Sequence, residues 1–127
     1  MDRVAPDVKV AVFIDFDNIR RSIEDQFEPS RVDIHRMLQA ILDSTNGRII
    51  VKRAYADWGY CRDYRSDLLD NATEPVQTFH LTQRGKNGAD IRIAIDAMET
   101  ALRHSEITHV AIVSGDSDFT PLVMKLR

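Results

Sequence analysis

Short apolar runs alternate with segments of helical spacing along the chain. The run VKVAVFI at residues 8–14 is nearly continuous and rich in β-branched side chains, which is typical of a strand buried on both faces. Three further runs, at residues 48–55, 76–80 and 109–113, predict the remaining strands. Apolar spacing, an Asn46-Gly47 cap signal and a Thr-Pro start signal predict helices at residues 18–27, 32–42, 63–69, 88–104 and from about 120 onward.

One stripe of large apolar side chains stands out in the long helix that precedes the last predicted strand. Ile91, Ile95, Met98 and Leu102 recur at helical spacing, so we expect this side of the helix to pack on the sheet. Asp96 lies away from the stripe, among charged residues. The pattern alone therefore favours a solvated position for Asp96.

Strands that alternate with helices indicate an α/β fold with a central parallel sheet and helices on both faces. Right-handed crossovers place the carboxyl ends of all strands at one edge, where such sheets bind ligands. The length predicts a single domain, residues 1–127. Because the chain ends inside the predicted last helix, where α/β domains often add a strand, a domain truncated at its C-terminus is favoured over an intact small protein.

The composition is that of an ordinary globular domain, with 43% hydrophobic and 29% charged residues. The formal net charge of −3 gives no overall basic field, although carboxylates gathered for a metal would lower it while local basic patches remained. Cys61 is the single cysteine, which excludes an intramolecular disulfide and a cysteine zinc site. With no signal peptide and no apolar stretch of roughly 18 residues, we expect a cytoplasmic location.

Aspartates follow each of the four predicted strands. Asp15 comes after the first strand, Asp57 after the second, Asp90 at the start of the helix after the third, and Asp116 and Asp118 after the fourth. In a parallel sheet all of these positions lie at the same edge. Carboxylates that converge repel one another, and a bound divalent cation removes that cost. Oxygen ligands suit Mg²⁺ or Mn²⁺, which can activate water and stabilise a phosphoryl transition state.

Several of these residues have a structural alternative. Asp57 is in a loop, where aspartate is common, and Asp90 could cap the long helix and complement its dipole. Asp118 could cap the last helix, and Asn18 could cap the first one or bond to a carboxylate or substrate. The sequence leaves these alternatives open.

Basic and aromatic residues accompany the carboxylates. Arg84 and Lys86 lie in the glycine-containing segment just before Asp90 and are candidate phosphate contacts, although the segment lacks the spacing of a P-loop. Trp58 and Tyr60 stand beside Asp57 and could stack on a base, with a packing role favoured for Trp58.

Four motifs together resemble the NYN domain, a branch of the PIN-like nucleases that includes the LabA-like proteins. They cover nearly the whole chain in the family's order, and the last of them is the most specific. The motifs are IDFDNI (14–19), AYADW (54–58), KNGADIRIAIDAM (86–98) and SGDSDFTPL (114–122).

The resemblance implies a compact Rossmann-like PIN fold and a metal-dependent ribonuclease that acts on RNA with Mg²⁺ or Mn²⁺. It makes Asp15, Asp90 and Asp116 the firmest metal ligands and catalytic residues. It adds Asp57 as a catalytic residue and Asp118 as a supporting metal ligand. Asn18 joins Lys86 and Arg84 as a substrate contact. Asp96 also matches a family aspartate, which leaves its role undecided.

Two other functions remain open at this point. The Asp15-Phe16-Asp17 sequence would suit a haloacid-dehalogenase-type phosphatase, with Asp15 as nucleophile and Asp17 as acid/base, but the segment around Asp57 lacks the serine or threonine that this class needs. A non-catalytic RNA-binding or regulatory module could keep the same fold. Whether the chain forms a homodimer is also left open.

Overall fold

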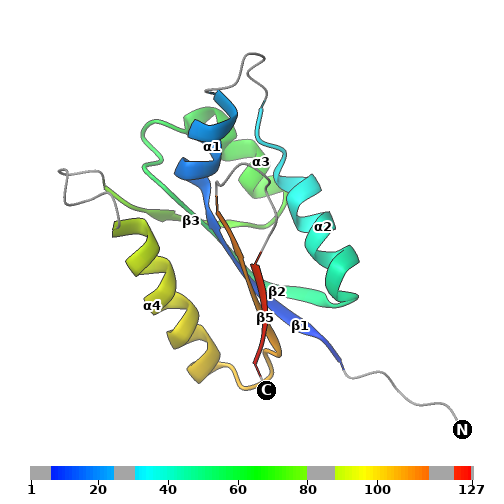
Figure 1. Cartoon of the computed structure of the whole chain (residues 1–127). Helices are drawn as coiled ribbons and strands as arrows, with labels where there is room; N and C mark the ends of the chain where they lie inside the picture. The colour runs from blue at the N-terminus through cyan, green and yellow to red at the C-terminus, as the bar shows by residue number, and fades with distance from the viewer. Residues whose placement is uncertain (1–6, 25–30, 80–87, 115–121, 127) are drawn as a thin grey trace, which may run out of the picture.

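A computed structural model describes residues 7–24, 31–79, 88–114 and 122–126 of the chain. These residues form a five-stranded sheet with the strand order β3-β2-β1-β4-β5. Helices α1, α2 and α3 lie on one side of the sheet and α4 lies on the other (Figure 1). The elements are β1 Lys9–Asp15, α1 Phe16–Glu24, α2 Ile34–Thr45, β2 Arg48–Ala56, η1 Arg62–Tyr64, α3 Arg65–Asp70, β3 Glu74–Gln77, α4 Gly88–Arg103, β4 His109–Val113 and β5 Leu122–Lys125.

Strand β1 is the centre of the fold. It pairs in parallel with β2 on one side and with β4 on the other, and β2 pairs in parallel with β3. Val10, Val12 and Ile14 point into the core shared with α1, α2 and α3, whereas Ala11 and Phe13 point toward α4. The continuous apolar run is therefore explained by burial on both faces, and the predicted α/β fold is confirmed.

The connection from α2 to β2 follows the predicted cap. Asp33 caps the start of α2 by accepting a hydrogen bond from the Arg36 backbone N–H at 3.0 Å. Asn46 ends the helix in the left-handed conformation with a φ of 51°. A Cβ atom on Gly47 would lie 2.6 Å from Val8 Cγ1, so this close approach to the strand requires glycine.

The chain after β4 differs from the sequence prediction. The sequence predicts a helix from about residue 120, but Leu122–Lys125 forms β5, which pairs antiparallel with β4. The backbone of β5 satisfies hydrogen-bonding groups along β4, and Val123 packs against the core on the α2 side. These gains outweigh the helix signal of a Thr-Pro start.

Helix α4 packs on the sheet through a different face from the one predicted. Ile93, Ala97 and Thr100 are buried, whereas the stripe of Ile91, Ile95, Met98 and Leu102 points outward, with Leu102 84% exposed. The prediction that this stripe packs on the sheet is therefore wrong. Ile93 and the small side chain of Ala97 pack in one buried cluster with the ring of Phe13 on β1. None of the described helices is long and apolar enough to cross a membrane.

Alanine substitutions on the two faces of α4 test this orientation. Ile93→Ala should lower the free energy of unfolding by about 2–4 kcal/mol, because it opens a cavity between α4 and the sheet. Ile95→Ala removes the same atoms from an exposed position and should cost less than about 1 kcal/mol. Urea unfolding of both variants measures the difference. Equal losses, or a larger loss for Ile95→Ala, would show that α4 is rotated.

Candidate active site at the carboxyl edge of the sheet

Asp15 ends the buried strand β1 and begins the site. Its side chain is almost fully buried, and its carboxylate accepts a hydrogen bond from the backbone N–H of Asn18 in the first turn of α1. The Asp90 carboxyl group, from the first turn of α4, lies within hydrogen-bonding contact of Asp15. The fold thus brings together two aspartates that are 75 positions apart in the sequence.

Burial and the negative charge of Asp90 raise the pKa of Asp15 to about 6, whereas the hydrogen bond from Asn18 acts in the opposite direction. A carboxyl group that keeps its proton near pH 6 can donate it to the neighbouring carboxylate. Below about pH 6 the pair therefore holds a proton in the absence of a cation. This proton marks a position where an added positive charge would be stabilised.

Asp57 occupies the loop directly after β2 and is held by its neighbours. Its Oδ1 accepts hydrogen bonds from the Gly59 backbone N–H at 3.2 Å and from Gln77 Nε2 at 2.9 Å. Its backbone N–H donates to Asp17 Oδ2 at 3.1 Å. Asp57 is therefore a fixed residue at the same edge, with one carboxylate oxygen turned toward the end of β3.

Asp17 has a structural role that sequence reasoning did not assign. Its side chain is buried below the α1 helix, where Oδ1 lies 3.5 Å from Arg20 Nη2 and accepts a weak hydrogen bond from Cys61 Sγ at 3.8 Å. Together with the bond from Asp57 N–H, these contacts tie the first turn of α1 to the loop after β2. An aspartate at the third position after a buried run is the signal that could have indicated a capping or bracing role.

Asp96 is not at the solvated position that its pattern favoured. Its side chain is 13% exposed, and Oδ2 accepts a hydrogen bond of 2.6 Å from the Tyr55 hydroxyl on β2. Arg92 Nε donates to the same oxygen at 3.2 Å. Because the apolar stripe of α4 points outward, Asp96 on the opposite side of the helix faces the sheet. Burial of the Tyr55 hydroxyl and its hydrogen bond to Asp96 raise the pKa of Tyr55.

Of the remaining candidate residues, one is exposed and four lie outside the residues that the structure describes. The side chain of Asn18 is exposed at the start of α1. Asp116, Asp118, Arg84 and Lys86 lie outside the described residues. In the part of the chain that is described, no three Asp, Glu, His or Cys side chains are grouped closely enough to hold a metal ion. The described portion thus contributes the Asp15–Asp90 pair to any such site.

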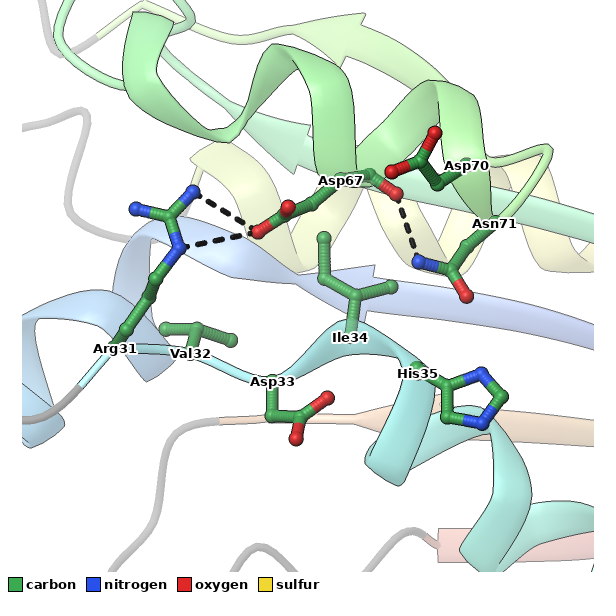
Figure 2. Close-up of a pocket in the computed structure, with 8 residues that line it drawn as sticks. All are labelled: Arg31, Val32, Asp33, Ile34, His35, Asp67, Asp70 and Asn71. Carbon is green, nitrogen blue, oxygen red and sulfur yellow. Dashed lines mark hydrogen bonds and ion pairs between the residues drawn. The ribbon is translucent and has the colours of Figure 1, made fainter.

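A separate hollow of about 470 Å³ lies between the start of α2 and α3 (Figure 2), and neither Asp15 nor Asp90 lines it. Arg31 crosses it, with Nη2 2.9 Å from Asp67 Oδ2 and the guanidinium stacked 4.1 Å from the centre of the Tyr64 ring. Asp33, on the same wall, already caps α2. Arg31 and Asp67 are thus paired with each other, and this contact joins the start of α2 to α3.

The mostly parallel sheet, with aspartates collected at the carboxyl ends of its strands, defines a PIN-like α/β domain. The family model of the NYN domain matches residues 9–127, so the chain belongs to the NYN family. NYN domains are generally nucleases, and membership supports a nuclease class for this chain. Searches of curated proteins and of solved structures found no match.

Because Asp15 is buried, we expect the free energy of unfolding to depend on pH. The pKa of Asp15 is about 6 in the folded protein, against an ordinary value of 3.8. Between pH 3.8 and pH 6, therefore, Asp15 is more often protonated in the folded state than in the unfolded state. Stability should therefore fall as the pH rises from about 4 to about 6, and the deficit should persist above pH 6. Asp15→Asn keeps a capping oxygen but cannot ionise. With chelator present at pH 7.5 it should be more stable than the wild type by about 2–3 kcal/mol.

Urea unfolding at several pH values measures this effect. Asp15→Ala is the control, because it removes the charge and also the capping bond to Asn18, and should gain about 1 kcal/mol less than Asp15→Asn. A wild-type stability that stays level between pH 4 and 6, with no gain in Asp15→Asn, would contradict the burial of a charged Asp15.

Proposed function

We propose that the chain is a metal-dependent endoribonuclease that hydrolyses RNA phosphodiester bonds. The observation that carries this proposal is the contact between the buried carboxyl group of Asp15 and the exposed carboxyl group of Asp90. Burial and the charge of Asp90 raise the pKa of Asp15, and a bound cation would offset both. Oxygen donors of this kind fit Mg²⁺ or Mn²⁺. Asp15 and Asp90 would hold the ion together with Asp116, and Asp118 would support them.

A bound divalent ion supplies a more acidic water and charge stabilisation for a phosphoryl transition state. The protein's own residues have separate tasks in this proposal. Asp57, fixed by Gly59 and Gln77, orients the attacking water or the substrate. Asn18 presents an exposed amide beside Asp15 and contacts the substrate, and Lys86 and Arg84 contact the RNA phosphates.

The phosphatase alternative is less well supported. It requires Asp17 to exchange a proton with substrate, but Asp17 is buried and accepts hydrogen bonds from Asp57 N–H and Cys61 Sγ. A carboxylate held in this way braces the loop and is poorly placed for proton transfer. The non-catalytic RNA-binding module remains the competing outcome of the cleavage experiment below.

Metal binding is testable without any catalytic readout. Mn²⁺ at saturating concentration should raise the thermal unfolding temperature of the wild type, because an ion that binds the folded state stabilises it. Asp90→Asn should remove most of this increase. Asp43→Asn, at an exposed aspartate on α2, is the matched control and should respond like the wild type. Equal metal responses in all three proteins would exclude Asp90 as a ligand.

Cleavage is tested with a fluorescent single-stranded RNA. The wild type should cut it with Mn²⁺ or Mg²⁺ and leave it intact with chelator. Asp116→Asn should reduce the rate by about 10²-fold or more while the circular dichroism spectrum is unchanged. Asp43→Asn should cut normally. Wild-type protein that binds the RNA but does not cut it with either ion would favour the non-catalytic module.

A further inference from the structure

A small hollow of about 260 Å³ opens beside Asp57, between the loop after β2, the start of α3 and strand β3. Trp58, Arg62, Arg65 and Gln77 contribute to its lining, and Leu68 and Pro75 add apolar surface. The hollow adjoins the candidate active site because Gln77 Nε2 donates a hydrogen bond to Asp57 Oδ1 and Trp58 follows Asp57 in the chain.

Two positive charges line this hollow, and no carboxylate of the described residues forms an ion pair with either of them. Asp63 and Asp67 are close to them in sequence, but both carboxylates pair with Arg31, at 3.3 and 2.9 Å. Within residues 7–24, 31–79, 88–114 and 122–126, neither the Arg62 nor the Arg65 guanidinium has a hydrogen-bonded or ion-paired partner. By contrast, each of five other arginines pairs with a carboxylate: Arg31, Arg48, Arg53, Arg92 and Arg103. Guanidinium groups free in this way can bind phosphate.

The aromatic wall of the hollow is held rigidly. The ring of Trp58 packs 5.0 Å from the ring of Phe16, and its Nε1–H donates to the Val76 carbonyl oxygen at 3.1 Å. Trp58 is only partly buried, so part of its surface remains available to the hollow. A fixed aromatic surface stacks on a base with little loss of conformational entropy.

The polar group in the lining does not read base identity. Gln77 Nε2 donates to Asp57 Oδ1 and to the Thr78 carbonyl oxygen, and Gln77 Oε1 accepts a hydrogen bond from the Trp58 backbone N–H. Its amide is therefore used in holding the loop. Recognition by stacking and by phosphate charge is tolerant of base sequence. It also requires a base that is free to leave a stack, which favours a single strand over a duplex.

We propose that the hollow lined by Trp58, Arg62 and Arg65 binds one nucleotide of a single-stranded RNA, next to the phosphate that is cut. This proposal rests on the proposed ribonuclease function. The base lies against Trp58 and the apolar wall of Leu68 and Pro75. Arg62 and Arg65 bind the phosphates that flank this base. The subsite positions the strand for the carboxylates at Asp15 and Asp90 and imposes little sequence preference.

The experiment uses Trp58 as its own reporter, since it is the single tryptophan in the sequence. Tryptophan fluorescence is titrated with single-stranded oligo(A) and oligo(U) of about eight nucleotides, a length within the site sizes of single-strand binding folds, in chelator so that no cutting occurs. Both oligonucleotides should change the emission with similar affinity. The double variant Arg62→Gln/Arg65→Gln should bind at least about tenfold more weakly and should lower the slope of log K against log salt by about 1–2.

Arg36→Gln is the matched control, because Arg36 is an exposed arginine on α2 outside this hollow. It should bind like the wild type. Near-identical binding by the double variant and the wild type would overturn the subsite. So would an RNA duplex that changes the emission as strongly as the single strands, or inorganic phosphate that does so at the same concentration.

Cleavage with Mn²⁺ separates this proposal from the proposed function. If the wild type cuts RNA, the double variant should show a raised KM with a smaller change in kcat. Cutting by the wild type together with an unchanged KM in the variant would refute the subsite and leave the ribonuclease proposal standing. Binding through Trp58 without cutting would refute the ribonuclease proposal and leave the subsite as part of a binding module.

Discussion

The structure depends on one costly arrangement, a carboxyl group at the end of its most buried strand. Strand β1 has neighbours on both sides and cores on both faces, so the chain leaves it at a point where water is scarce. Asp15 meets a second carboxyl group there, from Asp90, and its pKa rises to about 6. Such an arrangement lowers the stability of the fold. Carboxyl groups with a raised pKa of this kind are concentrated at functional sites of proteins.

Neighbouring aspartates in the same sequence motif have opposite tasks. Asp15 is buried beside another carboxyl group, and its hydrogen bond from Asn18 compensates for only part of that cost. Asp17 is equally buried but accepts hydrogen bonds from Asp57 N–H and Cys61 Sγ, so its negative charge is used in holding the loop after β2. The turn into α1 therefore contains Asp15, whose ionised form is unfavourable, and Asp17, whose hydrogen bonds hold the neighbouring loop in place.

Much of this was predictable because the pattern of a buried parallel sheet is strong. The run before Asp15 identified the central strand, and the order of strands and aspartates located Asp57 and Asp90 at one edge. Contacts between distant segments were not predictable. The bond from Tyr55 to Asp96 joins residues 41 positions apart, and nothing local marks it.

The error in α4 has a specific physical cause. Its large apolar residues and its small ones both recur at helical spacing, so periodicity identifies two faces without saying which one packs on the sheet. Hydrophobicity favoured the stripe that contains Ile95. Close packing against Phe13 selected the face of Ile93 and Ala97, which has smaller side chains. The short β5 strand was missed for a similar reason, because the free edge of β4 is a property of the assembled sheet.

A continuous series of hydrogen bonds connects the two halves of the candidate site. Asp17 accepts from the backbone of Asp57, the Asp57 carboxylate accepts from Gln77, and the Gln77 amide oxygen accepts from the backbone of Trp58. Asp17 belongs to the first turn of α1, two residues after Asp15, so the series begins close to the pair formed by Asp15 and Asp90. It ends at the aromatic wall of the proposed nucleotide subsite. Because every member is held by its neighbours, the spacing between the carboxylates and Trp58 is set by the fold and does not need to be established by the substrate.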